Sequence, residues 1–158
     1  MGLSLKSLAF FILISLAAGA IGGFFTASAI PNWYAGLAKP DFSPPNWVFG
    51  PVWTLLYILM GIAAYLIWEK GMAKKKVKGA LDLFFGQLTL NLAWSIIFFG
   101  LRSPLFAFAC IVFLWIAIAL TMRSFHAIDR RSAYLLAPYI LWVSFAAILN
   151  LAIVLLNP

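Results

Sequence analysis

Charged residues are scarce in this sequence. Only 9% of its 158 residues are Asp, Glu, Lys or Arg, whereas 65% are hydrophobic. A water-soluble domain carries roughly a quarter charged residues, because its surface must be hydrated. The composition therefore excludes an ordinary soluble protein and predicts an all-α integral membrane protein, with a single domain over residues 1–158.

Acidic residues, histidine and cysteine are scarcer still, with four Asp or Glu, one His and one Cys. The acidic residues lie near the ends of apolar runs, so no carboxylate pair is expected inside the bilayer for acid–base catalysis. One histidine and one cysteine are too few for a metal site or a disulfide. We therefore predict no metal, no required cofactor and no conventional enzymatic site; the residues concerned are Asp41, Glu69, Asp82, Cys110, His126 and Asp129.

Positive charge is concentrated in one short segment. Much of the net charge of +7 comes from Lys70, Lys74, Lys75, Lys76 and Lys78, which lie between two apolar runs. A nucleic-acid groove needs a folded basic face, which such a segment does not provide. The cluster instead indicates a loop against anionic lipid headgroups, so the expected partner is the bilayer and not nucleic acid.

Long uncharged intervals are what the sequence has in abundance. The charges leave five such intervals, and each can hold one helix of the roughly 20 residues that cross about 30 Å of hydrocarbon. We predict a five-helix bundle, with Ser103-Pro104 opening the fourth helix and Pro138 kinking the fifth. The predicted helices span residues 7–30, 46–69, 80–101, 103–125 and 132–156, with a first loop over 31–45.

The first apolar run has two interpretations. Lys6, the run itself and Ala27-Ser28-Ala29 resemble a signal peptide with its cleavage site. However, the run is longer than an ordinary signal sequence. It also carries Gly19 and Gly23 at the spacing that lets helices approach closely in membranes, with Ala18 and Gly22 offset by one. We favour a retained first helix.

The distribution of Lys and Arg predicts an orientation. Nine of the eleven belong to the N-terminus and to the second and fourth loops, and only Lys39 and Arg102 lie on the other side. The positive-inside rule then places the N-terminus in the cytoplasm and the first loop and C-terminus outside. The expected location is a bacterial cytoplasmic membrane.

Aromatic and amide residues predict a pocket. Four of the seven tryptophans lie a turn or more inside the predicted helices, instead of in an interfacial belt: Trp53, Trp94, Trp115 and Trp142. Two helices carry polar and aromatic residues at the spacing of one face: Gln87, Asn91, Trp94, Ser95 and Phe98 on the third, and Trp142, Phe145, Ala146, Leu149 and Asn150 on the fifth. The amides could simply join helices by hydrogen bonds, but the neighbouring tryptophans favour a pocket.

The first loop is rich in proline and aromatic residues from Asn32 to Trp47. Such a segment is stiff and partly apolar, so it should fold back over the helix ends as a lid; the alternative is a simple connector. Lys39 in this loop could meet a ligand carboxylate, or it could be an ordinary interfacial lysine.

Several blocks, in order along the chain, resemble the signature of the translocator protein family, also called the TspO/MBR, tryptophan-rich sensory protein or peripheral benzodiazepine receptor family. The longest runs from Leu37 to Thr54 and reads LAKPDFSPPNWVFGPVWT. Further blocks are LNLAW from Leu90, LLAPYILW from Leu135 and AAILN from Ala146. Long patterns in register are more specific than a single motif.

The resemblance implies five transmembrane helices, often in homodimers, with a pocket beneath the first loop. It implies binding of porphyrins, such as protoporphyrin IX and haem, and of benzodiazepine- and isoquinoline-type ligands. Some bacterial members are linked to light-dependent breakdown of protoporphyrin, which would assign a photochemical role to Trp53 and Trp142. The positions that match family pocket residues are Tyr34, Pro45, Trp53, Trp94, Ser95, Phe98, Trp142 and Ala146, and we add Gln87, Asn91 and Asn150 from the polar stripes.

Two departures from the family pattern are visible. The family's cholesterol motif needs a Tyr and a basic residue after Leu149-Asn150, and the sequence continues here as LAIVLL. Sterol recognition by that motif is therefore not predicted. The bulky Phe145 beside Ala146 is expected to reshape the pocket.

The leading hypothesis is a membrane receptor or sensor that binds porphyrins. Three alternatives stay open: a passive carrier of porphyrins or other small amphipaths, a light-dependent porphyrin-degrading protein, and an assembly partner that binds no ligand. No ionisable residue lies deep in a predicted helix, which weighs against ion-coupled transport.

Overall fold

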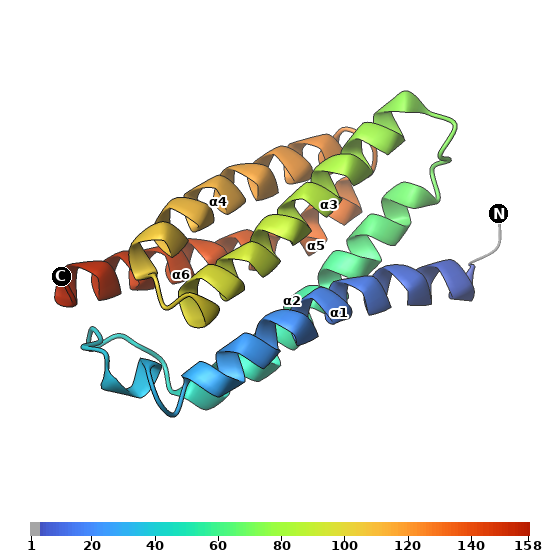
Figure 1. Ribbon diagram of the computed structural model, residues 1–158. Coiled ribbons are helices and arrows are strands. Elements are labelled where there is room, and N and C mark those ends of the chain that lie inside the picture. The colour runs from blue at the N-terminus through green and yellow to red at the C-terminus, as the bar shows by residue number, and fades with distance from the viewer. Residues whose placement is uncertain (1–3) are drawn as a thin grey trace.

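The computed structural model describes residues 4–158 as a helical bundle (Figure 1), with no strand in this range. Five helical segments are long and apolar enough to cross a membrane, so the predicted five-helix integral membrane fold is confirmed. The elements are α1 (Leu5–Ala29), η1 (Tyr34–Gly36), α2 (Asn46–Trp68), α3 (Lys75–Ser95), η2 (Ile96–Gly100), α4 (Pro104–His126), α5 (Arg130–Leu135) and α6 (Ala137–Leu156).

The bundle has two distinct ends. In Figure 1, α1 and α2 run side by side along one edge, and α3, α4 and α6 form the rest of the bundle. We call the end with the start of α1, the α2–α3 loop and the α4–α5 turn the lysine end. The opposite end, with residues 30–45, the α3–α4 connection and the C-terminus, is the loop end.

The third helix begins at Lys75, five residues before the predicted start at 80. Lys75, Lys76 and Lys78 are therefore helical, and the prediction that the lysine cluster is all loop was wrong in this part. The physical reason is burial, because Val77 and Ala80 are fully packed in the core at this end. Helix α3 thus extends beyond the apolar run that the charges delimit.

The last membrane crossing is broken rather than kinked. Helix α5 ends at Leu135, Leu136 is the junction, and α6 begins at Ala137. Pro138 consequently lies in the first turn of α6, where its missing N–H costs no intrahelical hydrogen bond. The predicted kink at Pro138 inside a continuous fifth helix is therefore replaced by a break at Leu136.

Helix α3 ends in a π-helical turn, η2, in which the Leu101 N–H donates to the Ile96 carbonyl over 2.8 Å. A π-turn inserts an extra residue into the helical repeat and rotates the side chains around it. Phe98 is buried and Phe99 half-buried in this turn.

Small residues set the approach of α1 to its neighbours. A Cβ on Gly61 of α2 would lie 2.5 Å from the Ile12 Cα, so the two backbones touch there. On α1, Gly19 lies against the Tyr57 ring, whereas a Cβ on Gly23 would meet nothing within 4 Å. The predicted small-residue face is therefore only partly a packing face, and the closest approach depends on Gly61.

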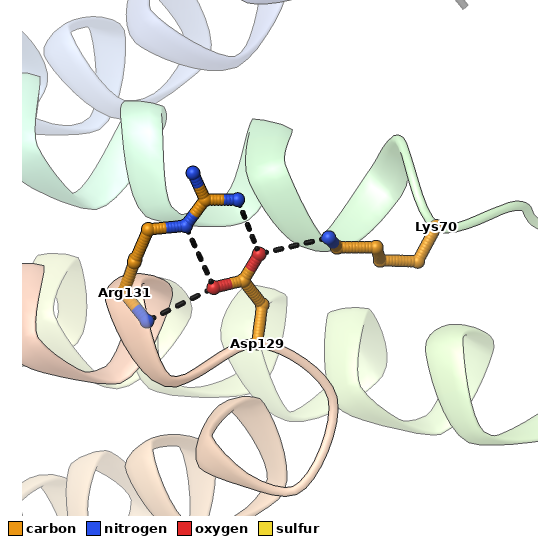
Figure 2. A network of polar contacts seen from close by, with 3 residues as sticks. All are labelled: Lys70, Asp129 and Arg131. Atoms are coloured by element: carbon orange, nitrogen blue, oxygen red, sulfur yellow. Dashed lines mark hydrogen bonds and ion pairs between the residues drawn. The ribbon is translucent and has the colours of Figure 1, made fainter.

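An ion-pair network secures the lysine end (Figure 2). The Asp129 carboxylate accepts hydrogen bonds from the Arg131 backbone N–H and guanidinium, and its Oδ2 lies 2.9 Å from the Lys70 Nζ. The hydrogen bonds from Arg131, together with Lys70, hold the pKa of Asp129 well below its usual range. The carboxylate stays charged and ties the end of α2 to the α4–α5 turn.

We predict that Gly61→Ala destabilises the protein by about 1–3 kcal/mol, because the new methyl group would force the α1 and α2 backbones apart. Thermal unfolding in detergent micelles would measure the loss. Gly86→Ala on the exposed face of α3 is the matched control, since a Cβ there meets nothing within 4 Å. Equal melting temperatures for the two variants would contradict the proposed contact.

Candidate ligand cavity

A cavity of about 640 Å³ occupies the loop half of the bundle. Its wall combines residues of α1, α2, α3, η2 and α6, and Tyr34 of η1 contributes from the first loop. Aromatic and other apolar side chains predominate in this wall. The aromatic members are Tyr34, Trp47, Phe49, Trp53, Tyr57, Trp94, Phe98, Phe99 and Trp142.

Trp53 of α2 is held between two tyrosines. Its ring stacks on Tyr57 with centroids 5.7 Å apart, and it meets the edge of Tyr139 at 6.3 Å. One turn earlier on α2, Phe49 meets Trp142 of α6 in an edge-to-face arrangement, with ring centroids 6.1 Å apart. Such contacts fix the ring orientations before any ligand arrives.

The third part of the wall comes from α3 and η2. Trp94 packs against Phe98 with centroids 5.4 Å apart. The Trp94 Nε1 donates over 3.0 Å to the Asn150 Oδ1, and the Asn150 Nδ2 donates over 2.9 Å to the Pro104 carbonyl. Asn150 therefore joins α3, α4 and α6, and its amide is already paired.

The first loop covers the loop end of the cavity through η1. Tyr34 is buried against Phe98 and Phe99, with ring centroids 6.3 and 5.8 Å away. This burial raises the pKa of the Tyr34 phenol, which stays neutral. Lys39 Nζ donates over 2.8 Å to the Tyr34 carbonyl and lies 4.8 Å from the centre of its ring. Lys39 thus stabilises the loop itself.

A side-chain amide near the C-terminus holds this loop in place. The Ala38 N–H donates over 3.0 Å to the Asn157 Oδ1, and the Asn157 Nδ2 donates over 2.9 Å to the Ala38 carbonyl. The pair of bonds resembles one rung of a β-ladder. We call this contact the Asn157 tether, and it connects the loop to the end of α6.

A buried polar network closes the cavity on the side of the lysine end. The Tyr57 hydroxyl donates to the Asn91 Oδ1, and the Asn91 Nδ2 donates over 2.9 Å to the Tyr139 hydroxyl. Tyr139 in turn donates over 2.7 Å to the Gln87 Oε1, and the Gln87 Nε2 lies 3.7 Å from the Met60 Sδ. This network joins α2, α3 and α6 in the middle of the bundle.

Eight of the eleven predicted site residues line the cavity: Tyr34, Trp53, Trp94, Ser95, Phe98, Trp142, Ala146 and Asn150. Three do not, because Gln87 and Asn91 lie in the network beyond Tyr57, and Pro45 is exposed in the loop. Phe145 also lies outside the wall and packs against Trp142 and Phe42 of the loop. It braces the loop instead of reshaping the cavity.

Helix α1 contributes to the cavity wall, although none of its residues was predicted to do so. Small residues of this helix, including Ala20, Gly23 and Ala27, line the cavity and are exposed, as are Gly50 and Thr54 of α2. Gly23 was predicted to let α1 pack closely against another helix. Its lack of a side chain instead leaves space for the cavity. Phe49, Tyr57 and Phe99 were also missed.

Polar groups in the wall are few. Ser95 is the one buried hydroxyl among them besides the tyrosines, and the Thr26 and Thr54 hydroxyls donate back to carbonyls of their own helices. The Trp142 Nε1 is buried and has no hydrogen-bond partner in residues 4–158. Within the same range, no group of three His, Cys, Asp or Glu side chains could hold a metal ion.

The fold and the cavity define an integral membrane protein with an aromatic cavity in one half of a five-helix bundle. The family model "TspO/MBR family" matches residues 11–156. The chain is 50% identical to the tryptophan-rich protein TspO of Archaeoglobus fulgidus over 147 residues, which cover 92% of this chain and 94% of that protein. It is also 44% identical to the tryptophan-rich protein TspO of Chlorobaculum tepidum over the full length of both chains.

Similarity extends to a eukaryotic protein. The chain is 41% identical to the human translocator protein over 131 residues, which cover 82% of this chain and 78% of that protein. The chain therefore belongs to the TspO/MBR family, as its sequence blocks predicted.

We predict that Asn157→Ala loosens the first loop, because it removes both bonds of the Asn157 tether. Amide hydrogen exchange at residues 34–40 should accelerate on the order of tenfold, since each hydrogen bond contributes about 1 kcal/mol. Asn32→Ala is the control, because the Asn32 amide bonds only the Ser28 carbonyl of α1. Unchanged exchange in Asn157→Ala would show that the tether does not hold the loop.

Proposed function

We propose that the cavity binds porphyrins, with protoporphyrin IX and haem as the expected ligands, and that the protein is a membrane receptor or sensor for them. The observation that carries the proposal is a cavity of about 640 Å³ with aromatic walls on several helices. This volume lies within the range of about 300–1,000 Å³ that is typical of small-molecule sites. A flat macrocycle can stack on such rings while its polar edge reaches the loop end.

Benzodiazepine- and isoquinoline-type molecules fit the same argument. They are smaller, flat and mostly apolar, and they carry few polar groups, as does the cavity wall. Relatives named translocator protein and tryptophan-rich sensory protein support a role in binding or sensing, since the chain is 36% identical to the latter from Cereibacter sphaeroides over 127 residues.

Packing favours binding over passage through the protein. Beyond Tyr57, the lysine half of the bundle is filled by side chains such as Met60, Ala64 and Phe84, each less than 2% exposed. A carrier would need a second opening toward that end. We therefore rank a passive carrier below a receptor.

The charges support an orientation in the membrane. The lysine end holds the start of α1, the α2–α3 loop and the α4–α5 turn, which together carry nine of the eleven Lys and Arg residues. We propose that this end faces the cytoplasm and that the cavity lies in the outer half of the membrane.

The binding proposal predicts that Trp53→Phe and Trp142→Phe each weaken protoporphyrin IX binding about three- to tenfold, because each removes part of an aromatic wall. Absorption of the porphyrin, titrated with purified protein in detergent, would give the dissociation constants. If the two rings contact one ligand independently, the affinity of the double variant should fall by the product of the two single-variant factors.

Trp115→Phe is the matched control for these variants. Trp115 lies on the outer face of α4, is 40% exposed and donates to the Ser144 hydroxyl, away from the cavity. It should bind porphyrin like the unmodified protein. Equal affinity in the double variant and in Trp115→Phe would exclude the cavity as the porphyrin site.

A second candidate is light- and oxygen-dependent modification of the bound porphyrin. The contact of Trp53 with Tyr57 and Tyr139 supports it, because a chain of oxidisable rings can supply an electron to an excited ligand. Illumination of protein with protoporphyrin IX in air should give a new absorbing product, which dark or anaerobic samples lack. A Trp53→Phe/Trp142→Phe variant that still binds porphyrin and forms the product at the same rate would limit both tryptophans to packing.

A further inference from the structure

A second cavity, of about 380 Å³, lies at the lysine end, far from the aromatic cavity. It is formed where the α2–α3 loop and the first turn of α3 face the α4–α5 turn. Four of its seven lining residues are lysines, and the other three are apolar: Lys70, Lys74, Lys75, Lys76, Val77, Ala127 and Ile128. We call it the lysine cavity.

Neither of the acidic residues nearest the lysine cavity forms an ion pair with Lys74, Lys75 or Lys76. Asp129 is shared between Lys70 and Arg131, as Figure 2 shows. The carboxylate of Glu69 accepts from the Tyr65 hydroxyl of its own helix. Lys74, Lys75 and Lys76 therefore face the cavity without a carboxylate of their own, since no salt bridge involves them within residues 4–158.

The start of α3 adds to this positive field. Its N-cap residue is Lys74, no side chain caps the first turn, and no acidic residue lies in that turn. The free N–H groups of a helix start and its dipole both favour an anion. Lysines at this position would be unfavourable unless an anion compensates them.

We propose that the lysine cavity binds the phosphate group of an anionic phospholipid from the leaflet at this end. A lipid is favoured over a soluble anion because the floor of the cavity, formed by Val77, Ala127 and Ile128, is apolar. The cavity also lies where the membrane-spanning helices α2 and α4 end. Helices of this length and composition are expected to end at the level of the headgroups. Met72, 40% exposed in the adjoining loop, adds apolar surface at the same level.

Lys70 differs from the other three lysines of the site because it is held by an ion pair. Its ion pair with Asp129 fixes one wall, because Asp129 is itself held by Arg131. The remaining three lysines are exposed and can close on a phosphate group from one side. The site therefore combines a fixed wall with adaptable cations.

Native mass spectrometry of the full chain in neutral detergent tests the proposal, with dioleoyl phosphatidylglycerol and dioleoyl phosphatidylcholine as the two lipids. We expect one phosphatidylglycerol to bind at least about tenfold more tightly than phosphatidylcholine. Lys74→Gln/Lys75→Gln/Lys76→Gln should lose this preference. The control, Lys6→Gln/Arg123→Gln/Arg130→Gln, removes the same charge from exposed residues at the same end that do not line the cavity and should keep it.

Three outcomes would overturn the proposal. Equal losses in the two triple variants would mean diffuse attraction to the charged end, without a site. Equal binding of the two lipids to the unmodified protein would exclude an anionic headgroup, and this comparison needs no variant. If inorganic phosphate raises the melting temperature of the protein in neutral detergent as much as phosphatidylglycerol does, the occupant is a soluble anion.

Discussion

A polar side chain inside the bundle is costly unless it is paired within the protein, because the hydrocarbon around the bundle offers no alternative partner. The network of Tyr57, Asn91, Tyr139 and Gln87 meets this requirement with short hydrogen bonds among α2, α3 and α6. It fixes the relative depth of three helices at one level. Toward the lysine end the side chains fill the bundle, whereas toward the loop end residues of the same helices line the aromatic cavity.

Two kinds of interaction close the ends of this arrangement. At the lysine end the interaction is an ion pair, Lys70–Asp129. Water and lipid headgroups at the membrane boundary lower the desolvation cost of such a pair. At the loop end, backbone hydrogen bonds and aromatic contacts hold the first loop over the cavity. The protein thus places its charged contacts in one interface and its ligand cavity near the other.

The five spans could be predicted from sequence because charges are confined to the helix ends. The features of the helices that were not predicted depend on side-chain packing. Helix α3 begins at Lys75 because Val77 is buried. The break at Leu136 and the π-turn η2 depend on how side chains pack against the neighbouring helices. Composition and hydropathy contain no information on such contacts.

The cavity wall was predictable mainly at its deep tryptophans. Four tryptophans lie too deep in their helices for an interfacial belt, and three of them, Trp53, Trp94 and Trp142, line the cavity. The fourth, Trp115, faces away from it and bonds Ser144. Periodicity identifies a helix face but not the partner of each amide. It could not distinguish a ligand contact of Gln87 or Asn91 from the hydrogen bonds that the two amides form with tyrosines. The wall supplied by α1 consists mostly of small residues, and these were interpreted as a helix-packing face because both uses favour the same residue types.

The Asn157 tether has a consequence for how this sequence can change over evolution. Asn157 recognises only main-chain atoms of residue 38, namely its N–H and its carbonyl. The identity of the side chain at that position is therefore free to drift, and proline is the residue excluded outright, because it has no N–H to donate. Selection at this contact should therefore conserve the Asn157 side chain, while the side chain at position 38 can vary among related sequences.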